Sequence, residues 1–361
     1  MTEPDRLQQI ETALKESIGK HFPNCQFLAA FLVALLAVCK VTLHQIGDAL
    51  PGSQSAESGR QRILYFLKHA RLPDEAFAKA MAALIPFPKP WVLAIDRTDW
   101  KLGKTSINLM SLCVCYRGMG FSLLWMPLPK GPSNQAQRIA LMNRYLKLFG
   151  HESIAFLTAD REFIGAEWLA WLHQEKISFR IRIRRDNLLA LPGGDKIAPD
   201  LLIRRKTRCR KHALALWGVS VFVGGKPLKR GEHLCIISNV YTDVMSDYRE
   251  RWSIECLFQA LKSRGFDLEA THLTDDFRLC RLLGLLSLAL IWSYRTGEWL
   301  YEQPASSDQK PSRLKKHGRP ARSVLQAGLV FLRRLLLPLS GRFDKDDFGS
   351  ALRTLGKLST A

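Results

Sequence analysis

A short segment of this chain carries four side chains that together could hold a metal ion and a polyanion. Tyr248, Arg251, Glu255 and Lys262 are spaced so that one helix would place them on one face, within a stripe about 60° wide. A carboxylate can bind a cation, whereas a phenol, a guanidinium and an ammonium can bind phosphates. The pattern therefore favours a polyanion held beside a metal ion.

Two more acidic residues could complete such a metal site. Asp96 follows the apolar strand predicted for Trp91–Ile95, and Asp160 closes the strand predicted from Ile154. Acids just beyond the carboxyl ends of neighbouring strands meet at one edge of an open α/β sheet. With Glu255 they would provide three carboxylates, which are ligands suited to Mg²⁺ or Mn²⁺. Such ions can activate a water or hydroxyl and stabilise the leaving oxygen of a phosphodiester.

The acids have simpler interpretations and nearby rivals. A single Asp at the end of a strand often only caps the next turn, but three acids beside a basic helix favour the metal site. Asp99 and Glu162 are the neighbouring alternatives, and Asp99 is the stronger substitute. Glu250 would lie about 140° around the helix from Glu255 and should face away.

The elements that must position these residues change character along the chain. Residues 1–88 have helical periodicity, and the Pro-rich segment 86–90 ends it. Strands and helices then alternate in an order that predicts a mixed sheet covered by helices, with a hairpin turn at Arg117–Gly120. The predicted elements are strands at Trp91–Ile95, Ser106–Tyr116, Phe121–Pro127, Ile154–Thr158 and Ser178–Arg185, and helices at Asn134–Phe149 and Phe163–Gln174.

The second half of the chain contains a strand-rich insertion and then helices. Gly, Pro and β-branched residues predict strands across residues 187–240. A long helix is expected from Val244 to Gly265, an apolar helix from Leu279 to Tyr294 and an amphipathic helix from Val324 to Leu339. Residues 304–323 are polar and basic and read as a linker or a DNA-binding arm.

The charge of the chain indicates a polyanionic partner. The net charge is +20, and residues 176–231 hold fifteen lysines and arginines against three acids. Basic side chains at Arg180, Arg182 and Arg184 alternate along a predicted strand and could continue a DNA-binding groove. Six further positive charges fall within eight residues of the insertion, and we expect them to contact DNA: Arg204, Arg205, Lys206, Arg208, Arg210 and Lys211.

Hydrophobic and cysteine patterns favour a cytoplasmic protein. The apolar runs Phe27–Cys39 and Leu282–Tyr294 are shorter than the ~20 residues that span a bilayer, so we expect buried helices and no membrane partner. The eight cysteines have no metal-finger spacing, which favours reduced thiols.

The four-residue pattern resembles the Tyr-Arg-Glu-Lys signature of the IS-four family of DDE transposases from bacterial insertion sequences. The spacing Tyr248-x2-Arg251-x3-Glu255-x6-Lys262 matches that signature in full. The segments that begin at Ile95 and Asp160 look like the first and second acid motifs of the family. The similarity extends over about residues 90–295 and implies a ribonuclease-H-like core with a β-rich insertion before the helix that bears the Glu.

The resemblance also implies an activity. Asp96, Asp160 and Glu255 would be the catalytic residues and would hold two Mg²⁺ ions, with Mn²⁺ able to substitute. The expected reactions are hydrolysis at the transposon ends and strand transfer into target DNA, in some relatives through a hairpin intermediate.

The same resemblance assigns DNA contacts to residues around the Glu. Tyr248, Arg251 and Lys262 would contact DNA near the cleaved end, and Trp252 would help to support a flipped base. Trp217 is the candidate in the insertion to stack on that base.

These inferences combine into one expected organisation. The partners would be double-stranded DNA at the transposon ends and target, and a second copy of the chain in a synaptic homodimer, in the bacterial cytoplasm at the nucleoid. A structure-selective nuclease of the same fold and a domesticated, non-catalytic DNA-binding protein remain the alternatives. The expected regions are an N-terminal helical domain that either binds DNA or is a plain structural bundle (1–88), the first part of the catalytic core (89–186), a β-rich basic insertion (187–240), the rest of the core (241–303), and a basic linker with a C-terminal helical region (304–361).

Overall fold

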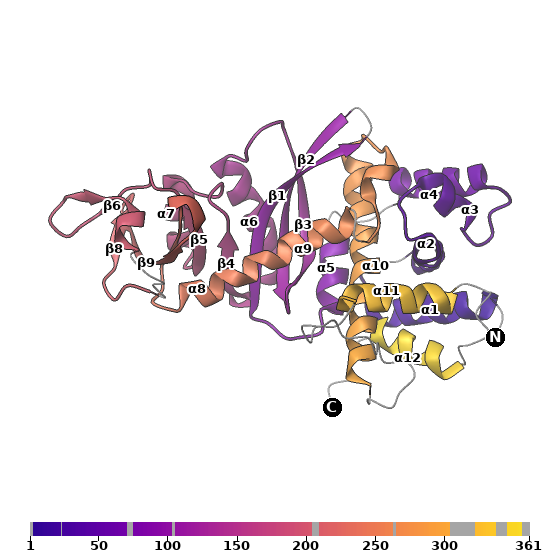
Figure 1. Ribbon diagram of the computed structural model, residues 1–361. Helices are drawn as coiled ribbons and strands as arrows, with labels where there is room; N and C mark the ends of the chain where they lie inside the picture. The colour runs from indigo at the N-terminus through magenta and orange to yellow at the C-terminus, as the bar shows by residue number, and fades with distance from the viewer. Residues whose placement is uncertain are drawn as a thin grey trace. The chain divides into compact units, whose positions relative to one another are not determined.

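The chain forms two compact units (Figure 1). The helical unit comprises residues 1–87, 100–106 and 259–361, and the sheet unit comprises residues 88–99 and 107–258. The computed structural model describes residues 3–22, 24–70, 75–102, 105–203, 209–262, 265–303, 322–336 and 345–355.

A ten-stranded mixed sheet is built in the order β3-β2-β1-β4-β5-β10-β9-β8-β6-β7. β1 is parallel to β4 and β4 is parallel to β5, whereas β10 runs antiparallel to β5 and to β9. The expected ribonuclease-H-like mixed sheet flanked by helices is thus confirmed. The strands are β1 (Trp91–Leu102), β2 (Thr105–Tyr116), β3 (Met119–Leu128), β4 (Ile154–Ala159), β5 (Phe179–Ile183), β6 (Leu189–Ala190), β7 (Lys196–Ile197), β8 (Leu214–Leu216), β9 (Val219–Pro227) and β10 (His233–Ser238).

The helices of the sheet unit have local sequence signals at their starts. Asn134 and Gln137 form a reciprocal capping box at the first turn of α6, which satisfies backbone donors that the helix leaves unpaired. Asp243 caps α8 by accepting from the backbone amide of Ser246. These helices are α6 (Gln135–Phe149), α7 (Ala166–Gln174), α8 (Val244–Asp247), the 3₁₀ turn η4 (Tyr248–Arg251) and α9 (Trp252–Leu261), with shorter 3₁₀ turns η1 (His151–Ser153), η2 (Pro199–Leu202) and η3 (Lys229–Gly231).

Figure 1 shows α8 and α9 as a nearly continuous helical run across one face of the sheet. Gly120 of β3 permits this close approach, because a Cβ atom there would lie 2.9 Å from the carbonyl oxygen of Ser253. The rings of Trp125 and Phe258 pack beside it, with centroids 6.4 Å apart. The glycine and the aromatic pair therefore hold the start of α9 against β3.

The helical unit is organised around α10 (Asp276–Glu302), most of which is buried. α10 packs against α11 and α12, and against α2, α4 and α5. A Cβ atom at Gly328 of α11 would lie 1.7 Å from the carbonyl oxygen of Ser293, so only glycine allows this crossing. The other elements are α1 (Glu3–Ile18), α2 (Cys25–Val38), α3 (Leu43–Asp48), α4 (Ala56–His69), α5 (Ala76–Leu84), η5 (Leu268–Thr271), α11 (Val324–Leu336) and α12 (Lys345–Leu355).

The length of α10 was underestimated from sequence. The apolar run suggested a helix over Leu279–Tyr294, but α10 extends beyond it at both ends. Among the described residues α10 alone is long and apolar enough to cross a bilayer, and 78% of its most apolar window is buried inside the protein. A buried core helix meets the same criteria of length and composition.

Several other boundaries differ from the sequence prediction for local reasons. The hairpin turn between β2 and β3 consists of Arg117 and Gly118 alone, both with positive φ, which matches the twist of the flanking strands. Gly59 lies inside α4, where it faces Gly47 of α3. The helix predicted from Val244 to Gly265 is interrupted by the 3₁₀ turn η4.

Candidate active site

The register of the parallel strands brings two of the predicted acids together. β1 and β4 are paired up to Ile95 and Ala159, so Asp96 and Asp160 follow at the same level on adjacent strands. Asp160 ends its strand as expected, but Asp96 lies in the middle of β1, which continues to Leu102. The strand was expected to end at the polar residues after Ile95, but its pairing with β2 carries it further.

Arg251 joins Asp96 to the third predicted acid. Its Nη1 lies 3.3 Å from Oδ2 of Asp96, and its Nη2 donates to Oε1 of Glu255. Asp96 and Arg251 are 155 positions apart in sequence, so this contact exists only through the tertiary fold. One guanidinium therefore bridges the acid of β1 and the acid of α9.

Asp160 has its own partners on the other side. The hydroxyl of Tyr248 donates to Oδ1 of Asp160 at 3.4 Å, and Nη1 of Arg182 lies 3.7 Å from the same oxygen. Ile181 of β5 is paired with Ala159, which places Arg182 level with Asp160. The residues Tyr248 and Arg251 also contact each other, with the guanidinium 5.7 Å from the ring centroid.

The helical run that carries Tyr248 and Arg251 is bound to the sheet by Asp247, the residue before Tyr248. Asp247, at the end of α8, accepts from Nε of Arg180 at 2.8 Å and from the hydroxyl of Thr242 at 3.1 Å. Tyr248 packs with Val244, Met245 and Ile236 in a buried cluster. In a 3₁₀ turn, residues three apart eclipse one another, so η4 stacks Tyr248 directly against Arg251.

Burial and neighbouring charges shift the proton affinities of this site. Burial, helped by the carboxylates of Asp160 and Glu255, raises the pKa of Asp96 to about 6, although the amide of Arg97 and the charge of Arg251 oppose the shift. Burial also raises the pKa of Tyr248 well above its usual range. Burial alone would lower the pKa of Arg251, but Tyr248, Glu255 and Asp96 raise it overall, which keeps the guanidinium charged.

The rival acids are engaged elsewhere. Glu162 accepts from Nε and Nη2 of Arg97 at 2.9 and 3.2 Å, and Asp99 accepts from Nη1 of Arg97 at 2.7 Å. Asn108 also accepts from Arg97. Arg97 directly follows Asp96, and Glu162 lies two residues after Asp160, so this pair ties together the two segments that carry the site acids.

The carboxylates of Asp96, Asp160 and Glu255 suit a hard divalent cation, but the guanidinium of Arg251 lies between Asp96 and Glu255. Three carboxylates are suitable oxygen ligands for such an ion. The described part of the chain contains no group of three or more His, Cys, Asp or Glu residues arranged to hold a metal. The residue types therefore fit a metal ion, and their present arrangement pairs each acid with a basic or phenolic group instead.

The remaining predicted DNA contacts are spread more widely. Trp252 is exposed at the start of α9, and Lys262 follows the end of α9 in the helical unit. Arg210 and Lys211 are exposed in the insertion. Four of the predicted residues lie outside the described residues: Arg204, Arg205, Lys206 and Arg208.

Trp217 lies several strands away from the acids in the sheet order. It lies in the two-residue turn between β8 and β9, with a positive φ and a largely exposed side chain. β8 is four strands away from β4 in the sheet, which corresponds to about 19 Å at the usual strand spacing. The structure therefore does not bring Trp217 to Asp160.

The prediction that Arg180, Arg182 and Arg184 form one exposed basic groove is wrong. Arg180 is buried, bound to Asp247 and stacked 4.7 Å from the ring centroid of Phe156. Arg182 faces Asp160, and Arg184 lies beyond the end of β5. Sequence alternation identified one face of the strand, but it could not show that this face lies under the helical run that bears Tyr248.

Arg182 and Arg97 are neighbours of the acid-bearing segments that the sequence did not predict. Arg97 was visible only as part of the first acid motif, and Arg182 only as part of a basic alternation. The available signal was position: Arg97 directly follows Asp96 on the same strand, and Arg182 lies level with Asp160 on the neighbouring strand. Reading that signal requires the strand order and the parallel register, which periodicity does not give.

A mixed sheet that carries clustered acids and is crossed by a helix with an arginine and a tyrosine has groups suited to metal-dependent chemistry on phosphate esters. Residues 87–292 match the family model described as the transposase DDE domain. The match covers more than half of the chain, which therefore belongs to this family and functions in DNA transposition. The family acts on DNA and depends on divalent metal ions.

Other comparisons add little to this assignment. A cryo-EM structure of the piggyBac transposase synaptic complex with hairpin DNA is similar over 99% of this chain and 86% of that chain, with a TM-score of 0.47 and 10% identity. No curated protein matches the chain.

Proposed function

We propose that this chain is the transposase of a bacterial insertion sequence of the IS-four family, which binds terminal inverted repeats, cuts the DNA ends and joins them to target DNA. The main support for this proposal is that Tyr248 and Arg251, which contact each other, also contact the three acids: Tyr248 contacts Asp160, and Arg251 contacts Asp96 and Glu255. These five residues come from two strands and one helical run, and all are part of the acid motifs or the signature. Hairpin formation remains one route that this assignment permits.

Asp96, Asp160 and Glu255 would hold Mg²⁺, with Mn²⁺ able to substitute, and two ions are the expected number. The ions would supply an activated oxygen nucleophile and stabilise the charge on the leaving oxygen of the phosphodiester. The charge and residue types of the site support this assignment, because clustered acids need a compensating cation. Arg251 places a positive charge between Asp96 and Glu255.

Arg251 would therefore exchange partners when DNA binds. A guanidinium binds phosphate in the same forked geometry as carboxylate, so a DNA phosphate can compete for it. Release of Asp96 and Glu255 frees their oxygens for the metal. Since binding free energies are reciprocal, DNA and metal would then strengthen each other's binding.

The other DNA contacts follow from the signature and the exposed basic groups. Tyr248 and Lys262 would lie along the backbone near the cut, and exposed Trp252 would support a flipped base. The basic segment from Arg204 to Lys211 would bind phosphates. Trp217 would contact DNA at a distance from the acids, because it lies next to β8, four strands from β4 in the sheet order.

Assembly and location complete the proposal. The chain would act as a homodimer in a synaptic complex, because both ends must be cut together, and would work at the nucleoid in the bacterial cytoplasm. The region before residue 88 would form the N-terminal DNA-binding domain, residues 89–186 and 241–303 the catalytic core, residues 187–240 the basic insertion, and residues 304–361 the C-terminal region.

The test is a reaction of the purified full chain with labelled end DNA, target DNA and Mg²⁺. The proposal expects metal-dependent cutting followed by strand-transfer products. Cuts without any joined product would instead favour a structure-selective nuclease. Tight DNA binding without metal-dependent turnover would favour a non-catalytic DNA-binding protein.

A further inference from the structure

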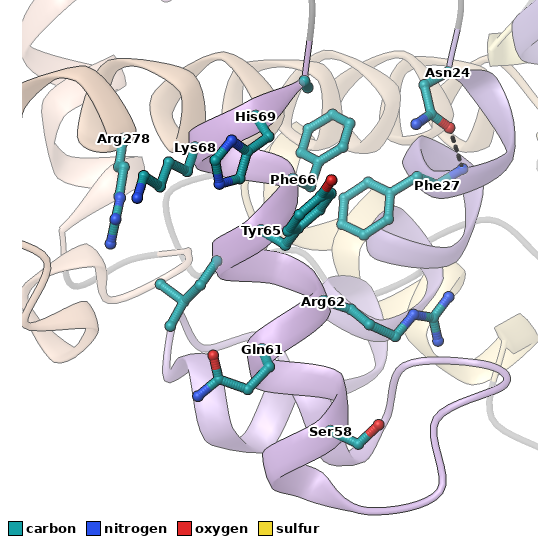
Figure 2. Close-up of a pocket in the computed structure, with 12 residues that line it drawn as sticks. Asn24, Phe27, Ser58, Gln61, Arg62, Tyr65, Phe66, Lys68, His69 and Arg278 are labelled. Carbon is teal, nitrogen blue, oxygen red and sulfur yellow. Dashed lines mark hydrogen bonds between the residues drawn. The ribbon is translucent and has the colours of Figure 1, made fainter.

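Helix α4 presents a basic face beside a cavity of about 900 Å³ in the helical unit (Figure 2). Figure 2 shows its side chains in a row along the helix. They are spaced at helical intervals, whereas Ile63 and Leu67 on the opposite face are buried. We define the α4 surface as Ser58, Gln61, Arg62, Tyr65, Lys68 and His69 of α4 together with Arg278 of α10.

The α4 surface is held rigid by its supports. A Cβ atom at Gly59 would lie 2.0 Å from the carbonyl oxygen of Gly47, so α3 and α4 cross in direct backbone contact. Arg62 donates to the carbonyl oxygen of Pro51 and to Ser53, which fixes the connection between the two helices. Below the surface, the rings of Phe27 and Phe66 stack with centroids 4.0 Å apart.

The charge of the α4 surface is one-sided. Arg62, Lys68 and Arg278 line the cavity, and no acidic residue lines it. Lys68 and Arg278 come from different helices and both line the cavity (Figure 2). Cations that line one cavity without a carboxylate repel, and a bound polyanion would relieve that repulsion.

The uncharged groups of the surface suit the same ligand. Tyr65 is 70% exposed, an unusual position for a large aromatic ring, and it lies 4.7 Å from the ring of His69. Ser58 and Gln61 add a hydroxyl and an amide of the kind that read base edges, and the Gln61 amide, which donates to Glu57 at 2.6 Å, would exchange that partner for a base. From Ser58 to His69 the face is about 17 Å long, and the B-DNA major groove, about 12 Å wide, admits one helix.

We propose that the α4 surface is a duplex-DNA binding site, in which Lys68 and Arg278 bind backbone phosphates while α4 lies along the major groove. The inference rests on the proposed function, which makes DNA the substrate, and it assigns a second DNA contact region separate from the acids. Most of the surface lies before residue 87, where the match to the transposase domain begins. Gln61 and Tyr65 are the residues that would distinguish one DNA sequence from another.

The experiment compares charge reversals in the full-length protein by fluorescence anisotropy with duplex DNA. Lys68→Glu is paired with Lys79→Glu, an exposed lysine of α5 that does not line the cavity. We expect Lys68→Glu to weaken binding at least ~10-fold and to lower the slope of log affinity against log salt by about one. Lys79→Glu should leave both quantities near those of the unchanged protein.

Further variants decide what the surface reads. Gln61→Ala and Tyr65→Ala should weaken binding to transposon-end DNA more than binding to an unrelated duplex. Equal losses on both duplexes would overturn sequence reading by these residues. Should Lys68→Glu unfold the protein by circular dichroism, Lys68→Gln replaces it and should weaken binding less.

Two results would overturn the site itself. One is that Lys68→Glu and Lys79→Glu bind DNA equally well with equal salt slopes. The other is that Lys68→Glu changes only self-association, measured by sedimentation, which would assign the surface to a protein partner. A chain that binds DNA through Lys68 but never cuts it would instead contradict the proposed function and leave this site standing.

Discussion

The acid site of the sheet unit and the α4 surface of the helical unit use positive charge in opposite ways. In the acid site, Arg251 and Arg182 are each held against carboxylates. On the α4 surface, Lys68 and Arg278 line a cavity without any acid. Paired charges keep the acid site compensated until a substrate competes for them, whereas uncompensated charges attract a polyanion from a distance. The chain thus separates a region suited to holding DNA from a region suited to acting on it.

The largest expected effect tests the acid site alone. Asp96→Asn removes a carboxylate without changing its size, so end cleavage should fall about a thousandfold or more, or roughly 4 kcal/mol of transition-state stabilisation. DNA affinity should change little, because the α4 surface is intact. Single-turnover cleavage and anisotropy measure the two quantities.

The matched control for this change is Asp99→Asn. Asp99 is the neighbouring acid, and it is bound to Arg97 on an exposed part of β1. Its loss should leave cleavage within about tenfold of the unchanged protein. Equal losses in the two variants would remove the distinction between the site acid and its rival.

The second effect tests the compensated state of the site. Without Arg251, Asp96 and Glu255 lose their shared cation, so Arg251→Ala should bind Mn²⁺ about tenfold more tightly without DNA, or about 1.4 kcal/mol. The same variant should cleave DNA roughly a hundredfold more slowly, because it cannot bind the phosphate. Electron paramagnetic resonance of free Mn²⁺ follows metal binding independently of cleavage.

Arg249→Ala is the control for that experiment, since Arg249 is exposed on the same 3₁₀ turn. It should leave metal affinity unchanged. Mn²⁺ affinity that is unaffected by Arg251→Ala would show that Arg251 does not compete with the metal.

A smaller effect tests the tie between the two acid-bearing segments. Glu162→Gln and Arg97→Gln each break the bidentate pair, and we expect cleavage to fall about tenfold in each. The double variant should lose little more than either single one, because both remove the same interaction. Additive losses would mean that the residues act separately. Thermal unfolding of each variant distinguishes a loss of stability from misplacement of the acids.

The smallest effect concerns pH in the metal-free protein. The pKa of Asp96 is raised to about 6 from 3.8, so the folded state prefers the protonated acid. The resulting stabilisation is complete below the unfolded value and is lost as pH rises through about 6. Asp96→Asn should remove this dependence and raise the unfolding midpoint by a few degrees at about pH 8 but not at about pH 4. Identical pH profiles of the two proteins would contradict the shift.

Mn²⁺ binding should show the opposite trend with pH. The metal requires the ionised carboxylate, so affinity should weaken as pH falls below about 6. Titrations across this range, with and without DNA, would show whether DNA moves the transition by drawing Arg251 away from Asp96.

Local patterns were sufficient to predict much of this protein. Alternating and helical periodicity predicted most strands and helices of the sheet unit, and the mixed sheet is confirmed, because these patterns depend on residues close together in sequence. The spacing of Tyr248, Arg251 and Glu255, with acid motifs at Asp96 and Asp160, predicted a DDE transposase, which the domain match confirms, whereas membership of the IS-four family stays a prediction.

Only the tertiary structure decided what each charged side chain touches. The bridge from Arg251 to Asp96 spans 155 positions, and the pair of Arg97 and Glu162 spans 65. Such contacts depend on the register of β1, β4 and β5 and on where the helical run crosses them. Periodicity gives the face of an element but not its neighbour. Sequence therefore predicted which acids form the site, and only the packing of distant segments decided which groups those acids contact.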